Sequence, residues 1–295
     1  MSTDFCSQQS YQMGIEPYGT ASEAMVWLLL EYHGEWRNQA LEDNDLPPAV
    51  QAWLHDAQRC IPRSRPLLIR SEKPRATRSF YIIDTTPHRP TLYHVPFDDY
   101  SELLSYDPQQ IIQGHSQLSP SDEKLFLVCT NGKRDQCCAK FGLPIYQAFQ
   151  SQEGIHTWQC THIGGHRFAS TGIVFPSGVT YGYITEEQVP SLAQAIRADQ
   201  VLLPLYRGRT AYSAWVNAAE YFLRKQEQLL ADADLTWRTS EQVSADVWQI
   251  MFSDAQGKSY RVQLNVTQHE PLPSSCFQPY KPQARFHLQH IEQVD

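Results

Sequence analysis

The sequence of 295 residues lacks several features that would place it in a common class of protein. It contains no run of about 18 or more apolar residues, so we expect no membrane-spanning helix and no membrane partner. The N-terminus, MSTDFCSQQS, lacks the basic and then apolar pattern of a secretory signal, which predicts a soluble, cytoplasmic protein. The formal net charge of −8 argues against nucleic acid as a partner, because phosphate recognition needs a concentrated basic surface.

The sequence also lacks the C-x-x-C motif that thiol-disulfide oxidoreductases place at a helix N-terminus. Its seven cysteines are an odd number without an export signal, which argues against a disulfide framework. Four of the seven lie between positions 129 and 160, and this clustering indicates metal binding or redox chemistry. The outlying Cys6, Cys60 and Cys276 are typical of ordinary buried thiols, and we assign no site to Cys6.

Hydrophobic patterning predicts an α/β fold (an α+β mixed sheet) in three parts, 1–115, 116–205 and 206–295. In the first part we expect a helix from Pro47 and Pro48 to about Cys60. The expected strands of this part are 26–32, 67–70 and 80–84, followed by a connector at 109–122. In the third part we expect a helix over 212–230 and strands over 247–252 and 259–266 joined by the hairpin turn DAQGK. The proline-rich end (Pro271, Pro273, Pro279 and Pro282) is predicted to be extended and irregular.

The middle part has the clearest pattern. We expect a strand over 125–129, a helix that Pro144 opens and that runs to about Gln150, a strand over 156–160, a hairpin of 173–176 and 180–184, and a helix over 186–197. A β-α-β unit followed by a hairpin and a helix is the order of elements in a thioredoxin-like domain. The first part has the same coarse order, which suggests a second, degenerate lobe without ligands.

Two cysteines and two histidines of the middle part form a possible set of four ligands, Cys129, Cys138, His162 and His166. They occur as C-x8-C and, after a gap of 23 residues, H-x3-H. Thiolates and imidazoles suit zinc and iron–sulfur centres, whereas Mg²⁺ and Ca²⁺ prefer oxygen. The spacing alone leaves coincidence, zinc and a [2Fe–2S] cluster open, because structural zinc sites usually use tighter cysteine pairs.

The chain resembles the sucrase/ferredoxin-like family, whose C-terminal part is similar to thioredoxin-like [2Fe–2S] ferredoxins. The resemblance covers nearly the whole chain and includes the segments 19–32, 128–138, 142–146, 158–169, 174–182 and 207–212. The segment HIGGH combined with the ten-residue cysteine loop is its most specific part. The resemblance implies a thioredoxin-like ferredoxin domain, preceded by the degenerate lobe and followed by a small α+β extension.

The resemblance further implies that Cys129 and Cys138 ligate one iron of a [2Fe–2S] cluster, while His162 and His166 ligate the other. Neutral imidazoles make such a cluster easier to reduce than four thiolates do. Bis-histidine centres have potentials of roughly −150 to +300 mV, against about −400 mV for plant-type ferredoxins. Electron transfer coupled to proton transfer is a further hypothesis, because a histidine ligand can lose its second ring proton.

Four residues near this set in the sequence need an interpretation. We favour Cys138 over the adjacent Cys137, because C-x8-C fits the family. Cys160 is interpreted as a buried neighbour rather than a ligand. Lys133 and Arg134 have two interpretations, a solvated turn or a small basic patch for an acidic redox partner.

The sequence therefore predicts an electron carrier or a redox sensor rather than a catalyst, with an unidentified redox protein as its partner. Two alternatives stay open, a zinc protein that acts as an interaction module and a thiol-disulfide oxidoreductase on the same fold. Glycoside hydrolysis needs two carboxylates across a sugar site, and no pair of acidic residues stands out for that role. The oligomeric state is not predicted.

Overall fold

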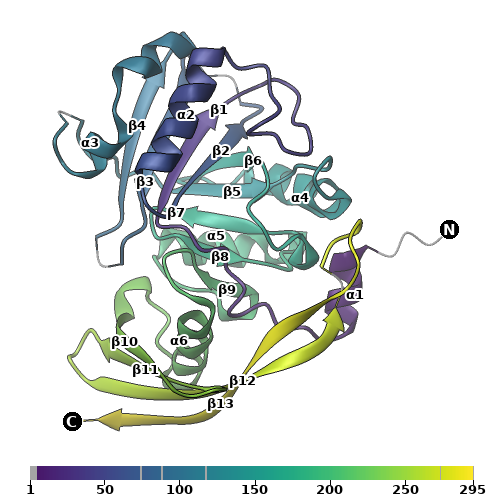
Figure 1. The fold of residues 1–295 in the computed structure, drawn as a ribbon, viewed down its shortest axis with the longest axis vertical. Coiled ribbons are helices and arrows are strands. Elements are labelled where there is room, and N and C mark those ends of the chain that lie inside the picture. Colours follow the sequence, from purple (N-terminus) through teal and green to yellow (C-terminus); the bar gives the residue numbers. More distant parts are fainter. Residues whose placement is uncertain (1–4, 74, 88, 117, 273, 295) are drawn as a thin grey trace.

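The computed structural model describes residues 5–294 except 74, 88, 117 and 273 (Figure 1). The larger of two sheets has nine strands in the order β4-β3-β1-β2-β6-β5-β7-β8-β9, with parallel and antiparallel pairs, which confirms the predicted α/β class. Gln117 of the predicted connector, Pro273 of the proline-rich end and the first four residues of the predicted lobe 1–115 lie outside the described residues. Within the described ranges, no helix is both long and apolar enough to cross a membrane.

The N-terminal half of the large sheet is built around β1, all of whose residues are buried. Such a continuous apolar strand is typical of a position covered on both faces. Strand β1 pairs in parallel with β2 and antiparallel with β3, which in turn pairs with β4, a strand that the sequence did not predict. The elements of this half are α1 (Cys6–Gln12), β1 (Val26–Glu31), α2 (Pro48–Cys60), β2 (Ser64–Arg70), β3 (Arg78–Asp84), β4 (Thr91–Phe97), the 3₁₀ helix η1 (Tyr100–Ser105) and α3 (Pro108–Ile112).

The second half repeats this order. Strand β5 pairs in parallel with β6 and antiparallel with β7, and β7 pairs with β8. The β-α-β, hairpin and helix order predicted for the middle part is therefore confirmed. The elements are β5 (Leu125–Cys129), α4 (Gln136–Phe149), β6 (His156–Cys160), η2 (His166–Phe168), β7 (Gly172–Phe175), β8 (Val179–Tyr181), η3 (Glu186–Gln188), α5 (Val189–Arg197), η4 (Leu203–Leu205) and β9 (Tyr206–Arg209).

The two halves form one continuous sheet because β2 and β6 pair antiparallel at their ends, through Ile69 with Cys160 and Arg70 with Gln159. Figure 1 shows the first half above and the second half in the middle of the molecule. This junction brings β6, which leads into the predicted histidine ligands, to the centre of the large sheet.

The predicted start of the helix at Pro144 is wrong. Helix α4 begins at Gln136, and Pro144 lies inside it. The side chain of Asp135 accepts a hydrogen bond from the backbone N–H of Cys137 and so caps the helix, a signal that outweighs the proline. Cys137 and Cys138 therefore lie in the first turn of a helix and not on an extended loop.

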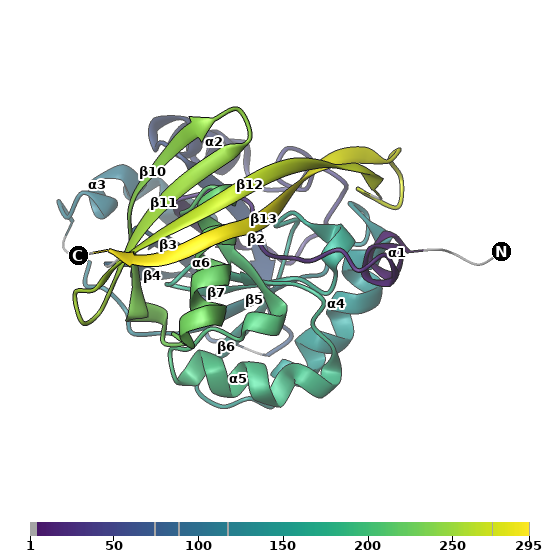
Figure 2. The same cartoon turned by 90° about the horizontal axis from the view of Figure 1, so that it is seen from below.

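The C-terminal part is a separate four-stranded antiparallel sheet in the order β10-β11-β12-β13, with α6 packed against it. The two predicted strands are present. The C-terminal end is extended, as predicted, but the prediction that it is irregular is wrong, because β12 and β13 form a long hairpin. Figure 2 shows this hairpin reaching from the small sheet to α1. The elements are α6 (Ala214–Glu227), η5 (Asp232–Asp234), β10 (Leu235–Ser244), β11 (Val247–Asp254), β12 (Ser259–Leu272) and β13 (Lys281–Val294).

A buried ion-pair network attaches α6 to β9. One carboxylate oxygen of Glu220 accepts hydrogen bonds from Arg209 Nε and Arg224 Nε, both at 2.9 Å, and the other accepts from the Tyr206 hydroxyl at 2.6 Å. Glu220 and Arg224 have no exposed side-chain surface. Arg209 Nη2 also lies 2.6 Å from a carboxylate oxygen of Asp232, so Glu220 is the carboxylate that the two guanidinium groups share, and Asp232 is a second partner of Arg209.

We expect Glu220→Ala to lower the free energy of unfolding by about 3–5 kcal/mol, because it removes the carboxylate that pairs with the buried Arg224 and one of the two carboxylates that pair with Arg209. Urea unfolding of the full chain measures the change. Glu227→Ala, at an exposed position of the same helix, is the control. An equal loss in the two variants would contradict the importance of the network.

Candidate metal centre

Cys129 lies at the end of β5, against the first half of α4. A Cβ atom on Gly142 would come within 2.2 Å of the Cys129 carbonyl oxygen, so only glycine permits this close approach of helix and strand. The Asp135 cap fixes the first turn of α4 beside the end of the strand. The fold thereby brings Cys138, in that first turn, next to Cys129.

The two histidines lie on the loop that follows β6. Gly164 and Gly165 adopt left-handed conformations, with φ of 88° and 75°, and let the chain turn between the two imidazoles. Two arginines donate hydrogen bonds to the backbone carbonyl oxygens of this loop. Arg65 donates to the carbonyl oxygens of His162 and Ile163, at 2.7 and 3.3 Å, and Arg207 donates to that of Gly164 at 3.2 Å.

The structure brings three of the four predicted ligands into one group and places the fourth, His166, beside His162. The sulfur atoms of Cys129 and Cys138 and a ring nitrogen of His162 all lie within 4.8 Å of one another. The ring centroids of His162 and His166 are 4.9 Å apart. His166 Nε2 also lies 3.8 Å from a carboxylate oxygen of Asp135.

The donor set fits a metal centre of mixed sulfur and nitrogen ligands. The Nδ1 atoms of both His162 and His166 are buried, and neither has a hydrogen-bond partner. Buried polar atoms normally find a partner, so two unpartnered imidazole nitrogens beside two thiols suggest that a further group binds there. Thiolate and imidazole are the donors that iron–sulfur centres and zinc use.

The electrostatics of the two thiols differ. The Cys138 thiol, with help from His162, holds the pKa of Cys129 well below its usual range. The pKa of Cys138 is raised by the hydrogen bond to the Cys129 sulfur and by burial. Cys129 is thus the member of the pair that first becomes a thiolate, the form that binds metals.

The structure shows the surroundings of Cys160, Lys133 and Arg134. Cys160 is fully buried and pairs with Cys129 in the sheet register, and it does not belong to the group of converging donor atoms. Lys133 is exposed, with its ammonium group 3.9 Å from a carboxylate oxygen of Glu35, while Arg134 donates to the Asn38 side chain at 2.9 Å. Both cations contact the loop of the N-terminal half that faces the cysteine loop.

Asp135, Arg65 and Arg207 also belong to this site, and the sequence did not predict them there. Arg207 lies in the segment RGRTAY, which carried part of the family resemblance, but its position in the sequence does not indicate contact with the histidine loop. Arg65 is the second residue of β2 and has no motif around it. For Asp135 a signal exists, since an aspartate before a helix is a typical N-cap.

We expect Gly165→Ala to prevent assembly of the centre. A Cβ atom there would lie 2.1 Å from a terminal nitrogen of Arg207, in a backbone conformation with φ of 75° that alanine rarely adopts. Metal bound per chain is the measurement, and we expect less than about half of the unmutated value because both histidines are displaced. Gly257→Ala is a matched control, since its φ is 85° but a Cβ would meet nothing within 4 Å. Equal metal content in the two variants would contradict the need for glycine at position 165.

The fold and the site define a mixed α/β protein with two thiols and two imidazoles at the junction of a central strand, a helix and a glycine-rich loop. The chain belongs to the sucrase/ferredoxin-like family, which it matches over residues 17–208. It is 29% identical over 143 residues to altered inheritance of mitochondria protein 32 of Meyerozyma guilliermondii. That match covers 44% of this chain and 47% of the relative, so the chain spans about half the length of the curated relative.

Among solved structures, the chain is similar to the thioredoxin-like [2Fe–2S] ferredoxin of Aquifex aeolicus. The identity is 16%, over 30% of this chain and 94% of that chain, with a TM-score of 0.28. A second structure of the wild-type ferredoxin gives 16% identity, over 30% of this chain and 100% of that chain, with a TM-score of 0.27.

Proposed function

We propose that the chain binds a [2Fe–2S] cluster through Cys129, Cys138, His162 and His166 and serves as a one-electron carrier or a redox sensor. The observation that carries the proposal is the convergence of two thiols with imidazoles whose Nδ1 atoms are buried without partners. Family membership supports it, and the name of the similar Aquifex aeolicus protein states a [2Fe–2S] cluster for that protein. When bound, the cluster would supply one-electron redox chemistry.

The residues of the chain would hold and tune this group. The cysteines supply anionic sulfur from the strand end and the helix start, and the histidines supply neutral nitrogen from the loop. Arg207, which is buried, and Arg65, which is half-buried, place positive charge beside that loop, and positive charge near a cluster favours its reduced state. Asp135, beside His166 Nε2, is positioned to orient the imidazole in the way that carboxylates orient histidine ligands.

We also propose the cytoplasm as the compartment and a redox protein as the partner. The odd number of cysteines, which argues against a disulfide framework, supports a reducing compartment. The division into 1–115, 116–205 and 206–295 remains a prediction. The repeated strand order of the two halves of the large sheet supports it.

The test is the composition of the full chain purified without oxygen. We expect about two iron atoms and two acid-labile sulfides per chain, with the red-brown visible absorption of a cluster. Cys129→Ser should lose both iron and colour. Cys60→Ser, which changes an exposed cysteine outside the proposed ligand set, should keep them. A colourless protein with zinc bound through Cys129 would instead favour the zinc alternative.

A further inference from the structure

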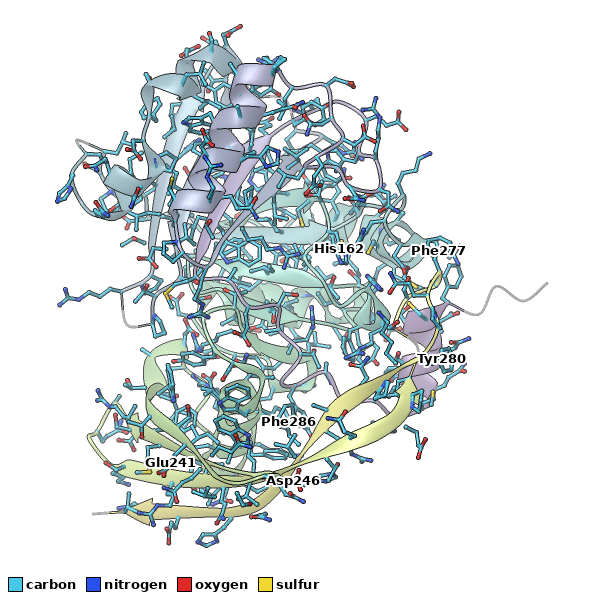
Figure 3. All side chains as sticks on the ribbon, in the orientation of Figure 1. His162, Glu241, Asp246, Phe277, Tyr280 and Phe286 are labelled. Atoms are coloured by element: carbon cyan, nitrogen blue, oxygen red, sulfur yellow. The ribbon has the colours of Figure 1, made fainter. Side chains whose placement is uncertain are left out.

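A second group of thiols lies outside the site described above. Cys6 of α1, Cys137 of α4 and Cys276 of the hairpin tip (residues 274–280) converge from three distant parts of the chain. Figure 2 shows the long β12–β13 hairpin ending beside α1, and Figure 3 shows Phe277 of its tip on the same side of the molecule as His162. None of these three cysteines belongs to the group that contains Cys129 and Cys138.

The distances within this group suit a single ion. The Cys137 sulfur is 3.5 Å from the Cys6 sulfur and 3.2 Å from the Cys276 sulfur. The three sulfur atoms and a carboxylate oxygen of Asp135 all lie within 4.8 Å of one another. Tetrahedral zinc with Zn–S bonds of about 2.3 Å places its sulfur ligands roughly 3.8 Å apart, so small movements would complete the site.

The adjacent Cys137 and Cys138 take part in different groups because they lie on a helix. Successive helical side chains point about 100° apart, so two neighbours cannot face the same ion easily. Cys138 packs with Cys129 in the core under the large sheet, whereas Cys137 packs with Cys6 and Cys276. The adjacent Cys137 and Cys138 therefore belong to two different groups of side chains.

Asp135 links the hairpin tip to this group. It is fully buried, and one carboxylate oxygen accepts hydrogen bonds from the Ser275 hydroxyl and the Cys276 backbone N–H, both at 2.9 Å. A buried carboxylate among three thiols has the donor chemistry of a zinc site, and a bound cation would compensate its charge.

We propose that Cys6, Cys137 and Cys276 bind one zinc ion, with the Asp135 carboxylate as the fourth ligand. The thiols release their protons to solvent when the ion binds. The ion joins α1, the start of α4 and the hairpin tip. It therefore holds the hairpin tip next to Asp135, which lies beside His166 of the candidate cluster site. The three thiols of this site are not ligands of the proposed cluster, and Asp135 is the residue that lies beside both groups.

Metal analysis of the full chain, carried out on protein washed with a weak chelator and supplied with Zn²⁺, tests the proposal. We expect about one tightly held zinc per chain, lost in Cys6→Ser and in Cys276→Ser, while iron content is unchanged. Cys60→Ser is the matched control and should keep the zinc. Zinc that stays in both variants and disappears only in His162→Ala would overturn the proposal, because the ion would then occupy the first site.

Zinc K-edge X-ray absorption of the unmutated chain tests the proposed ligand set of the zinc ion without any variant. We expect about three sulfur ligands and one oxygen ligand, with no imidazole scattering. A shell of two sulfur and two imidazole ligands would contradict the proposal. So would zinc-free protein in which mass spectrometry finds a disulfide between Cys137 and Cys276.

Discussion

Cys138→Ser should remove the visible absorption and nearly all bound iron from this protein, whereas Cys137→Ser should retain both. The physical reason is the direction of the two side chains in the first turn of α4. Only the Cys138 sulfur lies within 4.8 Å of both the Cys129 sulfur and a ring nitrogen of His162. Iron and sulfide analysis, together with the visible spectrum, measures the effect.

The same pair of variants separates the two proposed sites. If the zinc site exists, Cys137→Ser loses zinc and keeps iron, and Cys138→Ser does the reverse. Equal iron loss in both variants would contradict the assignment of Cys138 as the ligand. Circular dichroism of each variant verifies that the fold remains.

Replacing both histidines by cysteine should lower the midpoint potential by about 250 mV or more, the gap between bis-histidine and all-cysteine clusters. Thiolates are anionic where imidazoles are neutral, so the doubly substituted His162→Cys, His166→Cys protein carries a more negative centre that resists reduction. Protein-film voltammetry or a redox titration followed by visible absorption gives the potential.

His115→Cys, which adds a thiol at an exposed position, is the control and should leave the potential unchanged. A doubly substituted protein that keeps its cluster and its original potential would show that the histidines do not ligate iron.

Much of the large sheet could be predicted from the sequence because its central strands are buried on both faces. The predicted strands 125–129 and 156–160 match β5 and β6 at both ends. By contrast, β4 and β9 were missed. The predicted start of α4 is wrong because Pro144 is typical of a first helical turn. The capping residue, Asp135, lies nine positions earlier in the sequence.

The C-terminal hairpin was missed because its prolines resemble those of an irregular segment. Pro282 lies in β13, the edge strand of the small sheet, where a missing N–H costs no central hydrogen bond. Pro271 lies in β12 where the pairing with β13 shifts, between His269 and Leu272. Sequence patterning cannot reveal such positions before the sheet order is known.

The four candidate ligands could be proposed from spacing and family resemblance, and the fold brings them together. Neither spacing nor family resemblance predicted the second group of thiols, Cys6, Cys137 and Cys276. Cys6 and Cys276 are separated by 270 positions, and the backbone N–H of Cys6 nonetheless lies 3.5 Å from the Cys276 sulfur. The expectation of ordinary buried thiols also fails at Cys60, which is exposed.

The most direct test of the central claim is pulsed electron paramagnetic resonance of the full chain after reduction with dithionite. We expect the signal of one reduced [2Fe–2S] cluster with couplings from two imidazole nitrogens, and loss of these couplings when His162 and His166 are both replaced by cysteine. A signal without nitrogen coupling would contradict histidine ligation. A silent, colourless protein with zinc at Cys129 and Cys138 would contradict the cluster itself.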